Sequence, residues 1–134
     1  MLSKGLKDEK KEEVDKALNS LLTWDFIPQN WDAQQRDQIS KKIQQILGFN
    51  LDEIISTETN IFINTLQQKN FDFEMYEKLA DLLQQIITLE APENQTFLAE
   101  KIILIYKTAQ EESKTFSFNL VQKISETTKY LHQK

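Results

Sequence analysis

Apolar residues recur along most of the chain at intervals of three and four, which is the spacing of one face of an α-helix. The pattern predicts helices at about residues 8–24, 33–47, 51–69, 73–89, 94–112 and 117–131. The charged run over residues 1–8 is expected to fray. We therefore expect a single all-α domain over residues 1–134. Its five or six amphipathic helices would form antiparallel hairpins, in one helical bundle or a short α-hairpin array.

Local signals mark several helix ends. Gly48 follows residues 33–47 and suits a left-handed C-terminal cap. Asn50 with Glu53 is typical of a helix start, and Asp72 precedes the next apolar stretch. Because the stop at Gly48 and the start at Asn50 are so close, the flanking helices are expected to form a tight hairpin.

The last two predicted helices have an ambiguous join. Phe116 and Ile124 stay on roughly the face set by Leu98, so one helix over 94–131 fits the pattern. Such a helix would span about 57 Å at about 1.5 Å per residue, and would imply an oligomer or an elongated shape. Serine and threonine in 113–117 are able to cap a new helix, which favours a break there.

Helix starts near residues 8, 51 and 94 are evenly spaced, as in helical-hairpin repeats. Amphipathic helices of equal length also resemble one another without repetition, and we favour that explanation.

Composition narrows the chemistry. The 134 residues include no cysteine, which excludes disulfides, Cys-ligated zinc, iron–sulfur clusters and thiol catalysis. Two glycines and two prolines weigh against an all-β fold and against a glycine-rich phosphate loop. A chain of this length is able to bury a core without a metal or disulfide.

The formal net charge is −5 and Arg36 is the only arginine, which disfavours binding of nucleic acid. Residues 50–92 carry net −6 and residues 101–134 carry net +3. These regions would attract each other within the fold or between subunits, although chance variation on solvated faces is the favoured explanation. Since there is no signal peptide and no long apolar stretch, we expect a cytoplasmic protein without a membrane span.

Few residues suggest catalysis or metal binding. His132 is the only histidine and lies near the chain end, so a histidine-based site is not expected. Glu74, Glu77 and Asp81 lie on one side of a predicted helix, where we interpret them as a solvated face with Lys78 as an ion-pair partner. We expect no metal, no cofactor and no enzyme activity.

Glu58 falls inside the apolar stripe of the helix predicted for 51–69. A buried carboxylate must be paired or protonated, so Glu58 is a candidate anchor for a ligand or partner. A core glutamate held by a neighbouring side chain is the more conservative interpretation, as is a helix turn open to solvent.

Trp24 and Trp31 lie at the join of the first two predicted helices. Aromatic residues at such joins usually plug the core, which is the interpretation we favour. An exposed tryptophan would instead indicate a partner surface, because tryptophan is enriched at binding hot spots.

These observations favour a non-enzymatic helical module for protein–protein interaction or self-association, with another protein or a second copy as partner. The alternative is a bundle that binds a small apolar molecule or lipid in an inter-helix cavity. An enzyme that uses only carboxylates, lysine and tyrosine is a third hypothesis.

Overall fold

The structure is a computed structural model that describes residues 4–24, 31–114 and 117–132, without the side chains of 4–10, 32, 33 and 132. Its α-helices are α1 (Lys4–Leu22), α3 (Arg36–Leu47), α4 (Leu51–Ser56), α5 (Thr59–Gln68), α6 (Phe73–Ile87), α7 (Pro92–Ser113) and α8 (Phe118–Thr128). The π-helix η1 (Trp31–Gln35) leads into α3, and the 3-10 helix η2 (Lys129–His132) follows α8. These ranges contain no strand, which confirms the all-α prediction. None of these helices is long and apolar enough to cross a membrane.

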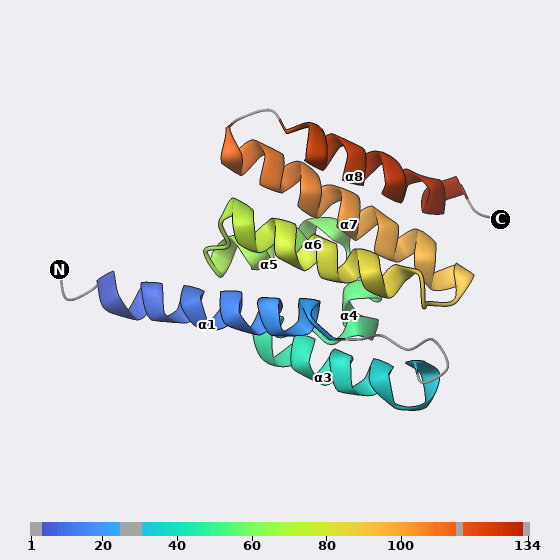
Figure 1. Ribbon diagram of the computed structural model, residues 1–134, viewed down its shortest axis with the longest axis horizontal. Coiled ribbons are helices and arrows are strands. Elements are labelled where there is room, and N and C mark those ends of the chain that lie inside the picture. Colours follow the sequence, from blue (N-terminus) through green and yellow to red (C-terminus); the bar gives the residue numbers. More distant parts are fainter. Residues whose placement is uncertain (1–3, 25–30, 115–116, 133–134) are drawn as a thin grey trace.

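Five helices lie side by side in the order α8, α7, α6, α1 and α3 (Figure 1). The shorter helices α4 and α5 pack against α7 behind this row. The central helix α6 contacts both α1 and α7, as its wide apolar face requires.

The number and direction of the helices differ from the prediction. The described residues form seven α-helices rather than five or six. The neighbours α1 and α6 run in the same direction (Figure 1). Ion pairs join Lys11 to Asp72 and Lys78 to Asp15 in the same order along both helices. A row of antiparallel hairpins therefore does not describe the whole fold.

Three helix ends follow their sequence signals. Gly48 has φ 82°, and its N–H donates to the carbonyl of Gln44 at 2.8 Å. Asn50 and Glu53 form a capping box, and the Asp72 side chain accepts a hydrogen bond from the Met75 N–H. These short-range signals work because each cap satisfies helix-end groups that lack a partner in the helix.

The predicted helix over 51–69 is wrong as a single element, because it divides into α4 and α5. Thr57 and Glu58 are extended at the break, with ψ angles of 142° and 139°. The Thr57 hydroxyl donates to the carbonyl of Glu53, at the end of α4. The backbone thus leaves the helical conformation for two residues before α5 begins at Thr59.

Residues 94–131 form two helices rather than one. Lys114 ends α7 in the left-handed conformation, with φ 58°. Ser117 begins α8, where its hydroxyl accepts a hydrogen bond from the Leu120 N–H. Phe116, which supported the single-helix alternative, lies outside the described residues.

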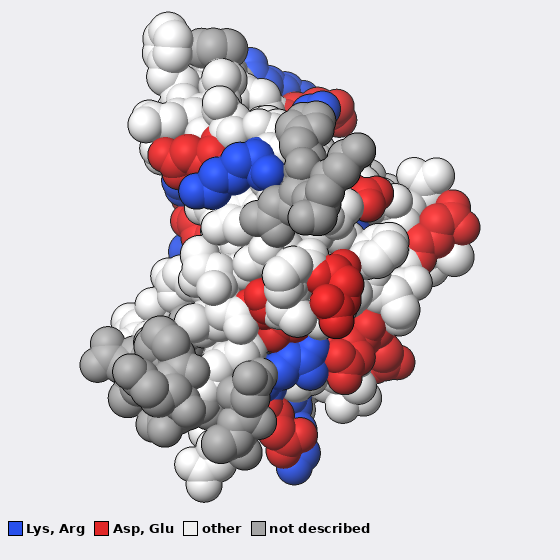
Figure 2. Space-filling model, turned by 90° about the vertical axis from the view of Figure 1, so that its right-hand side faces the viewer, with Lys and Arg blue, Asp and Glu red and all other residues white. Residues whose placement is uncertain are grey.

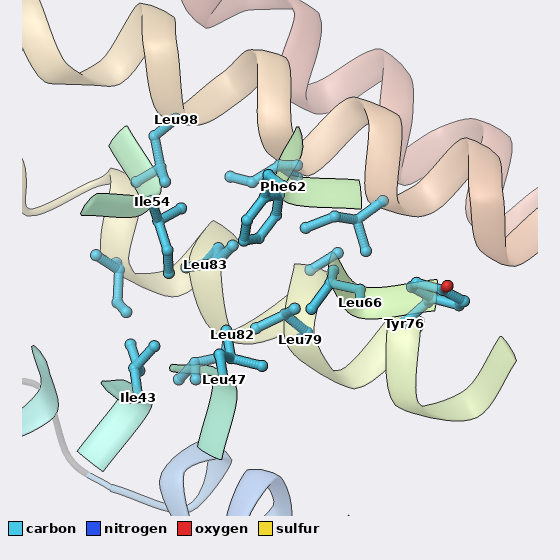
Figure 3. Packing of buried hydrophobic residues seen from close by; sticks show 14 of the residues in the cluster. Ile43, Leu47, Ile54, Phe62, Leu66, Tyr76, Leu79, Leu82, Leu83 and Leu98 are labelled. Atoms are coloured by element: carbon cyan, nitrogen blue, oxygen red, sulfur yellow. The ribbon is translucent and has the colours of Figure 1, made fainter. Parts of the chain in front are cut away.

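The core is built around α6. Leu79, Leu82 and Leu83 of α6 are fully buried among residues from several helices (Figure 3). Their surroundings include Leu47 of α3 and Phe62 of α5. Each such side chain stabilises the fold by about 1.5–3 kcal/mol through removal of apolar surface from water.

Candidate functional site

A groove of about 490 Å³ lies between the α4–α5 joint and the first half of α7. Its apolar lining includes Ile55 and Phe97, and the Phe97 side chain is 52% exposed although it belongs to a well-packed helix. Its charged lining includes Glu58, Glu93, Glu100 and Lys101. The groove exists because the chain breaks at Thr57, which separates α5 from the end of α4.

A second hollow of about 380 Å³ continues along α7 and shares Thr59 and Glu100 with the first. Its lining includes Ile103, Leu104, Lys107 and Leu131. We call the two hollows together the α7 groove.

The floor of the α7 groove follows one stripe of the helix. Eight residues of α7 line the two hollows, and five of them, at positions 93, 97, 100, 104 and 107, follow one another at intervals of three and four. This stripe is about 21 Å long at about 1.5 Å per residue. A second helix of about 14 residues has the same length, so the groove has the dimensions of a helix-docking surface.

Lys101 is a buried cation beneath the first half of the groove. Lys101 is 5% exposed, and its Nζ donates a hydrogen bond to the carbonyl of Ile55 at 3.2 Å. Burial lowers the pKa of Lys101, while the charge of Glu100 acts in the opposite direction. Because Ile55 is in the last turn of α4, the ammonium satisfies a carbonyl that lacks a partner within that helix.

Acidic side chains gather across the end of the molecule where α6 joins α7, mainly over the middle and right of the face in Figure 2. Glu58, Glu93 and Glu100 are all exposed. Within the described ranges, no three acidic or histidine residues are arranged to hold a metal ion. The side chain of His132 lies outside the described residues.

Glu58 is not a buried anchor, and its exposure agrees with the alternative of a turn open to solvent. Glu58 is the N-cap residue of α5 and is exposed on the groove rim. Glu58 would lie on the apolar stripe only in one continuous helix over 51–69, and the chain breaks at Thr57. A role for Glu58 in binding a ligand or partner stays a prediction, and Glu58 would act there from the rim of the groove.

Next to the groove, Trp31, Arg36, Asp52, Glu90 and Asn94 form what we call the Glu90 cluster. Glu90 accepts hydrogen bonds from the Trp31 indole N–H at 2.7 Å and from Arg36 Nε and Nη2 at 2.9 and 3.0 Å. Asn94 Nδ2 donates to Glu90 at 3.2 Å, and Arg36 Nη2 also donates to Asp52 at 2.7 Å. The bonds with Glu90 and then Asp52 raise the pKa of Arg36, and the bond with Arg36 lowers the pKa of Asp52. The cluster joins η1, α3 and α4 to the start of α7.

Trp31 is 1% exposed, so the partner-surface interpretation is wrong for this residue. Its indole lies in the core because Glu90 satisfies the N–H there. Trp24 is half-buried, and Lys42 Nζ lies 5.6 Å from its ring centroid. A partner contact at Trp24 stays a prediction.

A second polar group, the Asp81 cluster, joins α6, α7 and α8 through Glu77, Asp81, Gln84, Tyr106 and Lys123. Lys123 Nζ donates to Glu77 at 2.8 Å and to Asp81 at 3.0 Å. The Tyr106 hydroxyl donates to Asp81 at 2.6 Å, and it also lies 3.3 Å from Gln84 Oε1. One lysine of the basic end thus pairs with two carboxylates of the acidic middle within one molecule. Glu77 and Asp81 serve as ion-pair partners of Lys123 rather than as a free solvated face.

Sequence reasoning missed Phe97, Lys101 and Glu90. Lys101 lies three residues after Leu98 and four before Ile105, so a helical wheel of residues 94–112 would have placed it on the buried face. Phe97 lies off that face, so the same helical wheel would have shown a large apolar side chain exposed to water. Glu90 carries no local signal for its burial, because Arg36 and Trp31, which pair with it there, are 54 and 59 residues away.

Comparison with known proteins finds no family model, no characterised protein and no solved structure that matches this chain. The function therefore has to be inferred from the geometry of the molecule alone.

Proposed function

We propose that this chain is a non-enzymatic interaction module that receives a helical segment of another protein in the α7 groove. The observation that carries the proposal is the stripe along α7, in which Phe97 is 52% exposed in a hollow that continues to Lys107. Apolar side chains that line a groove of helical length are the usual anchor points for an amphipathic helix. A half-exposed phenylalanine gains apolar burial when such a segment covers it.

The proposal is tested with a photoreactive amino acid placed at position 97 or 107, both in the groove, and at 118 as a control. Phe118 is 81% exposed on α8 and does not line the groove, so it matches Phe97 in residue type but not in position. We expect one protein to cross-link from both groove positions and not from position 118.

The cross-linked protein is then purified and its affinity measured. Phe97→Gln should weaken binding about tenfold or more, because it removes a central apolar anchor, whereas Phe118→Gln should change it less than about twofold. Equal effects of the two substitutions would overturn the proposal. Light scattering gives the molar mass of the chain alone, and a stable dimer whose contact is sensitive to Phe97→Gln would make a second copy the occupant.

A small apolar molecule is the second candidate, since about 490 Å³ lies within the usual range for such sites. Dodecanol, which carries no charge, serves as the probe, and saturable binding that Phe97→Gln abolishes would favour this alternative. The exposed carboxylates on the rim oppose an anionic lipid, because they repel its head group.

A further inference from the structure

The two halves of the α7 groove differ in charge. Glu58, Glu93 and Glu100 line the half at the α4–α5 joint, and all three are exposed. Lys101 also lines this half, but it is 5% exposed and its Nζ is hydrogen-bonded to the carbonyl of Ile55. An incoming molecule therefore meets three carboxylates and no accessible cation from the described residues that line this half.

The other half has an apolar middle and an opposite charge at its far end. Beyond Thr59, Asn60 and the shared Glu100, it is lined by Ile103, Leu104 and Leu131, and the exposed Lys107 lies one turn beyond Ile103. A groove that is negative at one end and positive at the other distinguishes the two directions of a charged helix, because only one direction pairs unlike charges.

We propose, building on the docking function above, that the occupant is an amphipathic helix with lysine or arginine clustered at one end. That end lies against Glu58, Glu93 and Glu100. Its apolar face lies on Phe97 and Leu104, which are two helical turns apart on α7. Affinity comes mainly from the apolar contacts, while the carboxylates select a basic partner and fix its direction.

The test uses two fluorescein-labelled peptides of 14 residues with the same leucines on one face. One peptide carries three lysines at one end, and the other carries three glutamates at those positions. Fluorescence anisotropy measures the affinity of each for the full chain. We expect the lysine peptide to bind about tenfold more tightly, and this preference to shrink as salt screens the charges.

A matched pair of triple variants locates the charge effect. The groove variant combines Glu58→Gln, Glu93→Gln and Glu100→Gln. The control variant combines Glu74→Gln, Glu111→Gln and Glu126→Gln, which are exposed positions that line neither hollow of the groove. Both remove three negative charges, so general attraction to an acidic protein falls equally in the two. We expect the groove variant alone to lose the tenfold preference for the lysine peptide.

Three other results would each contradict a specific claim. If both peptides bind equally and Phe97→Gln weakens both, the groove docks helices but does not select basic ones. If the two triple variants lose the preference equally, the charge effect is non-specific and the inference fails. If neither peptide binds, or if Phe97→Gln has no effect, docking in the α7 groove fails together with its charge selectivity.

Discussion

The Glu90 cluster and the Asp81 cluster both join helices through a carboxylate, but they differ in their access to water. The Glu90 side chain is 2% exposed and that of its partner Arg36 is 24% exposed, whereas those of Asp81 and Lys123 are 30% and 21% exposed, so the difference lies in the burial of the carboxylate. Water screens a partly exposed ion pair, which contributes about 0.2–1 kcal/mol, while loss of one partner from a buried pair costs about 3–5 kcal/mol. Two networks of similar appearance are therefore expected to differ several-fold in their effect on stability.

The largest effect is expected for Glu90→Ala. It leaves the Arg36 guanidinium and the Trp31 indole N–H without their shared acceptor, and should lower the free energy of unfolding by about 3–5 kcal/mol. Urea unfolding followed by tryptophan fluorescence gives the value. The exposed neighbour Glu93→Ala is the control and should stay within about 0.5 kcal/mol. A loss below about 1 kcal/mol for Glu90→Ala would remove the distinction between the clusters.

Arg36→Lys sharpens the comparison, because it keeps the positive charge but removes the planar guanidinium with its several N–H donors. A lysine is unable to bind Glu90 through two parallel hydrogen bonds and reach Asp52 as well. We expect a loss of about 2 kcal/mol in urea unfolding, since charged hydrogen bonds contribute about 1.5–3 kcal/mol. Asp52→Asn should cost less than about 1 kcal/mol, because the Asp52 side chain is 72% exposed. If Arg36→Lys costs no more than Asp52→Asn, charge alone explains the cluster.

In the Asp81 cluster, Lys123→Met should lower the free energy of unfolding by about 1 kcal/mol. Methionine keeps much of the buried length of the side chain, so the measured change reports the ion pairs with Glu77 and Asp81. The matched control is Lys107→Met, an exposed lysine on the groove floor. A loss equal to that of Glu90→Ala would contradict the argument from burial.

The smallest effects distinguish two buried tyrosines. Tyr106→Phe should cost about 1 kcal/mol, because Asp81 loses a hydrogen-bond donor. Tyr76 is fully buried, and its hydroxyl has no hydrogen-bond partner among the described residues. Tyr76→Phe should therefore be neutral or stabilise by up to about 1 kcal/mol. Thermal unfolding of the two variants in parallel measures the difference, and a larger loss for Tyr76→Phe would contradict it.

Alkaline pH sharpens the comparison of the tyrosines further. Burial, with the charge of Glu112 as a smaller cause, raises the pKa of Tyr76 from 10.0 to about 12. The folded state thus holds this proton more tightly than the unfolded state, and the resulting stability is complete below pH 10 and lost between pH 10 and 12. Urea unfolding over this range should show a shallower decline for Tyr76→Phe than for wild type. Identical slopes would show that Tyr76 does not titrate differently on folding.

Local signals predicted the all-α fold and several helix ends, because helix ends are decided within a few residues. Gly48, Asn50 and Asp72 act at the positions that their chemistry favours. The break at Thr57 was missed because Ile55 and Phe62 keep the seven-residue spacing of one continuous helix across it. The polar run between them, over residues 56–60, was the available signal.

The candidate site was less predictable, because it depends on contacts between distant segments. The groove needs the α4–α5 joint to lie against α7, and no pattern within either segment specifies that contact. Trp31 illustrates the same limit, since its burial depends on Glu90. The residues next to Trp31 in the sequence do not reveal an acceptor 59 residues away, so they do not distinguish a buried tryptophan from an exposed one.

The position of Glu90 in the chain also has a consequence during protein synthesis. Trp31 and Arg36 leave the ribosome before Glu90 has been made, since 59 and 54 residues separate them from it. At about 5–20 residues per second, about 3–11 s pass between the synthesis of Arg36 and the synthesis of its acceptor Glu90. Throughout this interval the nascent N-terminal segment lacks the carboxylate that satisfies its indole and guanidinium. Completion of the N-terminal part of the core is therefore coupled to translation of the α6–α7 joint.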